Sequence, residues 1–246
     1  MTSNERIRVP GAVGTPIEGS VALVTGGSRG FGRAMVEELL ASGARKVYAT
    51  GRSEQPKLEE RIVPLVLDVT DDDSVATIAR QAIDISILVN NAGIALGTPV
   101  LDAPLDDIRA ELETNLFGIL RVTRAFAPIL ASHSPSAIVN VLSALSWIAA
   151  GRGYEISKAA AWSATNSIRL RLLEQGTTVT ALHVALMDTD LTAGVDRPKE
   201  DPRVIARQTV DAITSGQLEV LADERSRTIK AHLSGDLTEL YPQLAR

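Results

Sequence analysis

The feature that most constrains the fold is a regular alternation of short apolar runs with longer stretches of helical spacing. The runs have the length of strands. They are largely apolar rather than alternating, which is typical of strands buried on both faces of a sheet. They lie at 21–25, 46–50, 62–67, 85–89, 137–142, 178–184 and 218–222. The stretches with helical spacing lie between them, at 30–42, 72–83, 104–131, 153–175 and 202–215.

Strand, helix and strand in repetition imply right-handed crossovers and a parallel sheet with helices on both faces. We therefore predict an α/β fold, a single doubly wound domain over residues 20–246 with a sheet of about seven strands. The segment between Gly51 and Ile62 contains Pro56 and is short for a full helix, so this crossover is predicted to be abbreviated. Residues 1–19 are predicted to form a flexible extension, and a C-terminal tail is expected from about residue 223.

The composition excludes several classes of function. With 25 Lys and Arg against 30 Asp and Glu, the net charge is −5, so nucleic acid is not an expected partner. The absence of cysteine excludes disulfides and thiolate metal sites, and the 3 histidines lie far apart, so no metal site is expected. The N-terminus lacks the apolar core of a secretion signal, and no apolar run approaches the ~20 residues of a membrane span. We expect a cytoplasmic protein with no membrane partner.

A glycine-rich turn, TGGSRGFG at 25–32, follows the first predicted strand. Glycine lets the backbone approach a pyrophosphate without a Cβ clash, and the N–H groups that begin the next helix attract phosphate. An ordinary tight turn is the alternative, but the position after the first strand of an α/β pattern favours a dinucleotide site. The residues predicted to bind the dinucleotide here are Gly26, Ser28, Arg29, Gly30, Phe31 and Gly32.

The spacing Gly-x-x-x-Gly-x-Gly departs from the common dinucleotide fingerprint and resembles that of the short-chain dehydrogenase/reductase family. Further motifs of that family occur in the family's order over residues 20–222. The resemblance implies a Rossmann-type fold, a nicotinamide cofactor and oxidation or reduction of a small molecule.

The end of the second predicted strand indicates which nicotinamide cofactor is used. A site selective for NAD would carry a carboxylate there, about 20 residues past the glycines, but the sequence has Arg52. Arg52 and Arg29 can together clamp a 2′-phosphate, which favours NADP(H). Two solvated surface arginines are the alternative.

The resemblance implies further cofactor contacts. Asp68 and Val69 end the third predicted strand and match the family position that binds the adenine, although Asp68 could instead cap the next helix. The sequence NNAG at 90–93 matches the family segment that shapes the sheet and borders the adenine ribose. The residues assigned to the cofactor from this segment are Asn90, Ala92 and Gly93.

Tyr154 and Lys158 lie near the start of a long predicted helix, where a four-residue step places both side chains on one face. A phenol is a poor acid at neutral pH, but a neighbouring ammonium stabilises the phenolate, so we expect a lowered pKa for Tyr154. Tyr154 can then exchange a proton with a carbonyl or alcohol oxygen. In the family this lysine also binds the nicotinamide ribose, so both residues are predicted to contact the cofactor.

Two more catalytic residues follow from the resemblance. Ser143 matches the family serine that hydrogen-bonds the substrate oxygen, with Ser146 as the competing candidate. Asn115 matches the asparagine that holds a water between the lysine and bulk solvent. A polar residue that bonds a helix backbone is the alternative for Asn115.

The sequence after the sixth predicted strand departs from the family pattern. Val184 and Ala185 replace the usual Pro-Gly, and the Cβ of Ala185 can shift the backbone near the nicotinamide. Met187 and Thr189 are predicted to contact the cofactor. His183 is expected to be a packed, hydrogen-bonded histidine, with a proton relay as the alternative.

Together these motifs predict an NADP(H)-dependent oxidoreductase, a carbonyl reductase or alcohol dehydrogenase that reversibly reduces a ketone or aldehyde with Tyr154 as the acid and base. A silent NADP(H)-binding sensor or scaffold, and a non-redox enzyme on the same fold, are the alternatives. The substrate is expected to be a small carbonyl or alcohol compound, in a pocket formed by 94–102, 144–153 and 190–203. The family usually associates through its long helices, so a homodimer or homotetramer through 104–131 and 153–175 is expected.

Overall fold

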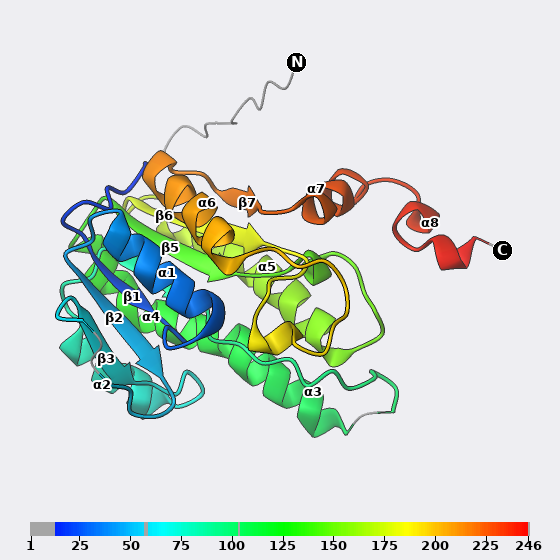
Figure 1. The fold of residues 1–246 in the computed structure, drawn as a ribbon, viewed down its shortest axis with the longest axis horizontal. Coiled ribbons are helices and arrows are strands. Elements are labelled where there is room, and N and C mark those ends of the chain that lie inside the picture. The colour runs from blue at the N-terminus through cyan, green and yellow to red at the C-terminus, as the bar shows by residue number, and fades with distance from the viewer. Residues whose placement is uncertain (1–12, 57–58, 103, 246) are drawn as a thin grey trace, which may run out of the picture.

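A parallel sheet of seven strands forms the centre of the computed structural model, which describes residues 13–56, 59–102 and 104–245 (Figure 1). The strand order is β3-β2-β1-β4-β5-β6-β7, and every neighbouring pair is parallel. The strands are β1 (Val21–Val24), β2 (Lys46–Gly51), β3 (Ile62–Val66), β4 (Ile87–Asn90), β5 (Ser136–Val141), β6 (Thr177–His183) and β7 (Glu219–Leu221). The predicted α/β fold, a single Rossmann-type domain, is confirmed.

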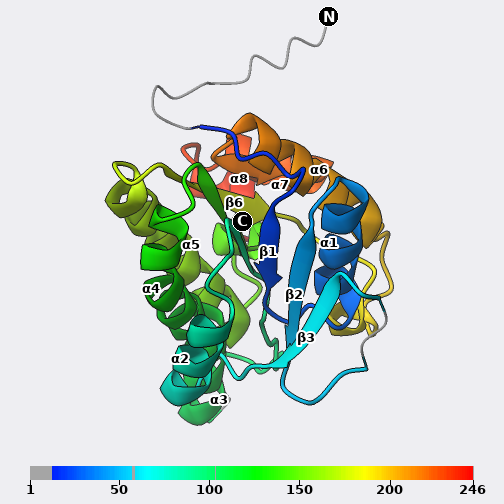
Figure 2. The same ribbon diagram turned by 90° about the vertical axis from the view of Figure 1, so that its left-hand side faces the viewer.

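Helices cover both faces of this sheet. Figure 2 shows α1 and α6 on one face and α2, α4 and α5 on the other. The helices are α1 (Gly30–Ala41), α2 (Asp72–Gln81), α3 (Leu105–Leu112), α4 (Gly118–Ala131), α5 (Gly153–Leu172), α6 (Pro202–Ser215), α7 (Glu224–Ala231) and α8 (Leu237–Leu240). Right-handed crossovers between parallel strands produce this two-sided arrangement.

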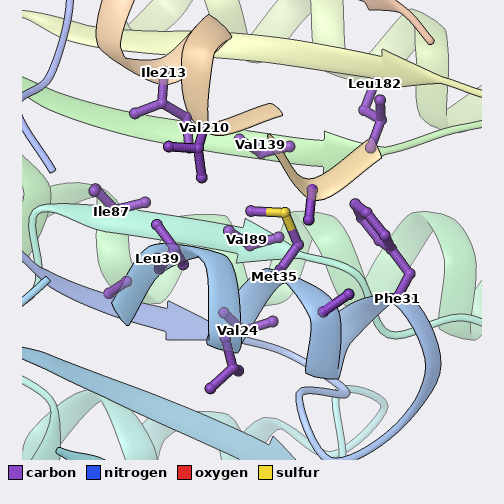
Figure 3. Close-up of a cluster of buried hydrophobic side chains, with 14 of the residues drawn as sticks. Val24, Phe31, Met35, Leu39, Ile87, Val89, Val139, Leu182, Val210 and Ile213 are labelled. Carbon is purple, nitrogen blue, oxygen red and sulfur yellow. The ribbon is translucent and has the colours of Figure 1, made fainter. Parts of the chain in front are cut away.

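Successive residues of the central strands pack into different cores, which is why their sequences are continuously apolar. Val24 and Val89 join Met35 and Leu39 of α1 in the core that faces α1 and α6 (Figure 3). Their neighbours in the sheet, such as Leu23, face the opposite core with α2 and α4. The two cores hold the strand ends rigidly, and these ends carry the predicted site.

The predicted helix over 104–131 is interrupted. Between α3 and α4 the chain makes a π-helical turn at Glu113–Phe117, with Asn115 in its middle. A π turn inserts one extra residue and redirects the side chains after it. The redirected Asn115 is wholly buried, and its contacts belong to the predicted site.

The link between β2 and β3 contains no helix among its described residues, as the abbreviated crossover predicts. The N-terminal extension differs from the prediction in its described part, because residues 13–19 pack on the domain. The N–H of Thr15 donates to the carbonyl of Ile213 at 3.0 Å, and Ile17 is 4% exposed. Residues 1–12 of that extension lie outside the described residues. Within the part of the chain that is described, no helix has the length and apolar character to cross a membrane.

Candidate active site

The predicted site residues gather at the carboxyl edge of the sheet, around the point where the strand order changes direction. β1 and β4 are hydrogen-bonded neighbours, but the chain leaves β1 for α1 and leaves β4 for the helices of the other face. Such a switch point opens a crevice between the two connections, and ligands of doubly wound sheets bind there.

The glycine-rich turn lines this crevice with bare backbone. Gly30 begins α1 with φ of +51°, a conformation that favours glycine. A Cβ at Gly32 would lie 2.1 Å from the carbonyl oxygen of Gly26, so a side chain there would displace the turn. Arg29, which precedes the helix, makes no capping bond with its side chain. The turn and the start of α1 therefore fit a pyrophosphate, since they present backbone N–H groups on a surface free of side chains.

The segment after β4 fastens the turn in place. The Asn91 amide donates to the carbonyl oxygens of Thr25 at 2.8 Å and Gly26 at 3.1 Å, and the Ala92 N–H donates to the Thr25 hydroxyl at 3.0 Å. Asn91 was not among the predicted site residues, although it belongs to the NNAG sequence that could have identified it. The side-chain amide of Asn90 is buried between strands and donates to Asn140 at 2.8 Å.

Three other predicted cofactor residues, Phe31, Met187 and Val69, pack their side chains in or against the hydrophobic cores. Phe31 is 4% exposed and lies in the core beneath α1 (Figure 3), because the second position of this helix faces the sheet. Met187 packs against the same core. Val69 is also buried, and a Cβ at Gly118 would lie 2.8 Å from its side chain. These residues shape the walls through packing rather than through polar contacts.

Arg52, predicted to bind the 2′-phosphate, follows β2 near Ser28 of the glycine turn and Asp68 of the predicted adenine contact. Ser28 Oγ would lie 3.2 Å from a Cβ at Gly51, the residue before Arg52. The pKa of Asp68 is lowered, first by hydrogen bonds from the side chain and N–H of Thr70 and further by the nearby Arg52 guanidinium. Arg29, the second residue predicted to bind the 2′-phosphate, has Nη1 3.1 Å from Oδ2 of Asp190, and both side chains are largely exposed.

Ser143 and the start of α5 form the other half of the site. Ser143 follows β5, is 4% exposed, and donates its hydroxyl to the carbonyl of Val184 at 3.3 Å. The competing Ser146 is turned back, and its hydroxyl accepts from the N–H of Ser143 at 3.4 Å. The Ser143 side chain lies near enough to the Tyr154 phenol to act on it by lowering its pKa, and Ser146 is not among the causes of that shift. The geometry therefore favours Ser143 over Ser146.

Tyr154 and Lys158 share one face of α5, as their spacing predicts. The Lys158 ammonium lies 5.6 Å from the centre of the Tyr154 ring and donates to the carbonyl of Val141 at 2.8 Å. The expected lowering of the phenol's pKa is wrong for this structure. Burial raises the pKa of Tyr154, and the carboxylates of Glu111 and Glu155 raise it further. Burial also lowers the pKa of Lys158 to about 8, because desolvation penalises both charged forms.

Asn115 connects this helix to the loop after β4. Its amide donates to the carbonyl of Ile94 and its oxygen accepts from the Ile94 N–H, both at 2.9 Å. The same amide donates to the hydroxyl of Ser157 at 2.9 Å, and Ser157 donates to the carbonyl of Tyr154 at 2.7 Å. A Cβ at Gly93 would lie 3.0 Å from the Asn115 oxygen, so that glycine makes room for Asn115. Ser157 was missed because its sequence context carries no signal.

The chain after β6 closes the crevice from the far side. A Cβ at Gly30 would lie 3.5 Å from Thr189, so this loop approaches the glycine turn. The N–H of Ala185, where the family has glycine, donates to Asp223 at 2.6 Å. His183 is wholly buried, has its pKa lowered to about 3 by burial, and places Nδ1 3.0 Å from the carbonyl of Ser143. It is thus packed and hydrogen-bonded, as expected from its place at a strand end.

Comparison with known proteins gives consistent results. A solved short chain dehydrogenase from Burkholderia cenocepacia, in complex with NADP, is 37% identical with a TM-score of 0.89, covering 94% of this chain and 100% of that one. The NADP-dependent 3-hydroxy acid dehydrogenase of Schizosaccharomyces pombe is 28% identical over 237 residues, 84% of this chain and 92% of the relative. The uncharacterized oxidoreductase YusZ of Bacillus subtilis is 33% identical over 174 residues, 63% of this chain and 61% of that protein's length.

The family model described as short chain dehydrogenase matches residues 20–200, which hold the glycine turn, the NNAG segment, Ser143 and the Tyr154–Lys158 pair. This range is most of the chain, and the seven-stranded sheet agrees with the solved relative. The chain belongs to the short chain dehydrogenase family of oxidoreductases.

Proposed function

We propose that this chain is an NADP(H)-dependent oxidoreductase that reversibly reduces a ketone or aldehyde to an alcohol, as a carbonyl reductase or alcohol dehydrogenase. The observation that carries the proposal is the placement of the Tyr154 phenol, which lies near Ser143 and has the Lys158 ammonium 5.6 Å from its ring centre on the same helix face. These groups lie at the same edge of the sheet as the glycine turn.

Different residues would bind the different parts of the cofactor. The turn at 26–32 and the start of α1 would hold the pyrophosphate, Arg52 the 2′-phosphate, and Lys158 with Thr189 the nicotinamide end. The prediction of NADP(H) is supported by the NADP complex of the Burkholderia cenocepacia relative and by the NADP dependence of the Schizosaccharomyces pombe enzyme. When bound, the reduced nicotinamide supplies the hydride that reaches the carbonyl carbon.

The chain's own residues supply the proton and fix the carbonyl. The raised pKa of Tyr154 keeps the phenol protonated at neutral pH, so it can donate a proton to the carbonyl oxygen. The Ser143 hydroxyl would donate a hydrogen bond to the same oxygen and stabilise the negative charge that develops there. Lys158, with a pKa of about 8, retains a proton that can replace the one Tyr154 gives up. Asn115 holds the backbone of Ile94 beside this group.

The test is NADPH oxidation across aliphatic, aryl and β-keto carbonyl compounds, with Tyr154→Phe as the matched variant. Phenylalanine keeps the ring and removes the acid, so turnover should fall by roughly 10³-fold while the Kd for NADPH stays the same. Unchanged turnover in Tyr154→Phe would contradict the mechanism. NADPH binding without turnover of any compound in the wild-type protein would favour a sensor or scaffold instead.

We also propose that the chain forms a homodimer or homotetramer through the outer faces of α4 and α5. Phe117, which precedes α4, is 47% exposed, and Ile156 and Leu170 of α5 are 42% and 76% exposed. Apolar side chains this exposed favour association, because burial of their surface removes it from water. Light scattering should give a mass of two or four chains, and Leu170→Lys should shift it toward one.

A further inference from the structure

The chain beyond β7 contacts two segments that flank the candidate active site, although it lies outside the range that matches the family model. Asp223 precedes α7, is 6% exposed, and accepts from the N–H of Ala185 on the loop after β6. Tyr241, after α8, accepts with its hydroxyl from the N–H of Ala149 at 2.9 Å. The C-terminal segment 223–241 therefore contacts both the wall after β6 and the segment 144–152 that follows the predicted catalytic serine.

Lys230 makes a third contact, from the middle of this segment. Its ammonium lies 4.7 Å from the centre of the Trp147 ring and 5.6 Å from that of Trp162. The two indoles meet edge to face at 6.1 Å. Glu219 of β7 orients the ammonium through a hydrogen bond of 2.9 Å. A cation over an aromatic face is attracted to the ring, so Lys230 fixes the tilt of Trp147.

Trp147 transmits this constraint to the end of β5. Its ring stacks on the His183 ring with centres 3.9 Å apart and an angle of 21° between the planes. His183 Nδ1 lies 3.0 Å from the carbonyl oxygen of Ser143. A carbonyl only accepts, so Nδ1 carries the hydrogen and donates it. A continuous series of contacts thus leads from Lys230 through the two rings to the backbone of Ser143.

We infer that Lys230 is a positioning residue for Ser143, acting through the stacked rings of Trp147 and His183. This inference rests on the proposed function, in which the Ser143 hydroxyl must meet the carbonyl oxygen at hydrogen-bond distance. Without the ammonium, the Trp147 ring can tilt and His183 can follow it, which displaces the carbonyl it bonds. Small displacements of a group that stabilises a transition state reduce the rate of the chemical step more than the binding of the cofactor.

The kinetic test compares three substitutions on one helix. Lys230→Met keeps the aliphatic stem and removes the charge, while Lys230→Arg keeps a cation that can lie over the indole. Arg227→Met is the matched control, because among the described residues its side chain bonds Glu224 and the carbonyl of Leu221 and does not contact the tryptophans. We expect kcat to fall roughly tenfold in Lys230→Met, with KM for NADPH unchanged, and to stay near the wild-type value in the other two. Equal losses in all three variants would overturn the inference, since they would report damage to α7.

Two measurements do not depend on turnover. The chain has 2 tryptophans, Trp147 and Trp162, and both lie beside Lys230, so intrinsic fluorescence reports directly on this cluster. Amide hydrogen exchange of the peptide 142–150 reports on the segment that Lys230 is inferred to hold. Lys230→Met should change the emission and speed this exchange, and Lys230→Arg should restore both. If the wild-type protein reduces no carbonyl compound, the proposed function fails, while faster exchange would still support the inferred positioning. Unchanged exchange in Lys230→Met would overturn it.

Discussion

The candidate site has a dinucleotide half formed mainly by backbone and a catalytic half formed mainly by side chains. The dinucleotide half, around the turn at 25–32, consists of backbone whose shape is set by glycines and held by Asn91. The catalytic half consists of buried side chains, since Lys158 is 5% exposed and Asn115 is 0% exposed. The first half depends on the absence of Cβ atoms, and the second depends on the low dielectric around titratable groups.

This difference predicts which kinetic constant a substitution in each half should change. A defect in the dinucleotide half should weaken cofactor binding and leave the chemical step intact once the cofactor is bound. A defect in the catalytic half should slow the chemical step without weakening the cofactor. The predictions below test this separation, from the largest expected effect to the smallest.

After Tyr154→Phe, the largest effect is expected at Ser143. Ser143→Ala removes the hydroxyl that lies near the Tyr154 phenol and would stabilise the carbonyl oxygen, so kcat should fall by roughly 10²–10³-fold with an unchanged Kd for NADPH. Ser146→Ala is the matched control, three positions along the same segment, and it should retain most of the activity. Steady-state kinetics with a fluorescence titration of NADPH measure both constants. A large loss of kcat in Ser146→Ala, with none in Ser143→Ala, would show that Ser146 is the catalytic serine and that the assignment of Ser143 is wrong.

The next largest effect is expected at Gly32, in the dinucleotide half. Gly32→Ala places a Cβ 2.1 Å from the carbonyl oxygen of Gly26, so the turn must move. We expect the Kd for NADPH to rise about 100-fold, with kcat at saturating NADPH nearly unchanged. Gly194→Ala is the control, because a Cβ there meets no atom within 4 Å. If Gly32→Ala lowered kcat and left Kd alone, the two halves would not be separable.

The sequence predicted the fold and the position of each motif because both follow from patterns in neighbouring residues. Continuous apolar runs identified the strands, and glycines identified the turn. The π turn at Asn115 was not predictable, since it is accompanied by bonds to Ile94, which is 21 residues away in the chain. The direction of the Tyr154 pKa was missed for a related reason. Spacing on a helix shows which side chains are neighbours, but not how completely the fold removes them from water.

Besides burial, the motifs did not predict the direction in which a side chain points. Phe31 belongs to the glycine-turn sequence, yet its ring is in the core beneath α1. Asn90 belongs to the NNAG sequence, yet its amide bonds Asn140 inside the sheet. A motif locates a residue along the backbone, and only the packing of the fold decides whether its side chain or its N–H and carbonyl groups face the crevice.

A smaller effect is expected at Arg52, which with Arg29 is predicted to set the choice of cofactor. Arg52→Asp replaces a cation that would bind the 2′-phosphate by an anion that repels it, so the KM for NADPH should rise roughly tenfold or more. The KM for NADH, which lacks this phosphate, should change little. The measurement is the ratio of the KM for NADPH to the KM for NADH. Equal changes in both KM values would show that Arg52 does not bind the 2′-phosphate.

The smallest effect is a pH dependence that assigns the proton in the catalytic half. The pKa of Lys158 is lowered to about 8, so its ammonium loses its proton as pH rises through that value. Tyr154, whose pKa is raised, stays protonated over the same range. The kcat/KM for carbonyl reduction should therefore fall as pH rises, reaching half its plateau value near pH 8. This alkaline limb of the pH–rate profile would report the titration of Lys158 rather than that of the Tyr154 phenol. In Lys158→Arg the guanidinium remains charged well above this range, so any activity that this variant retains should lack the limb. A limb near pH 8 that persisted in Lys158→Arg would assign the proton to another group and would end the division of roles between Lys158 and Tyr154.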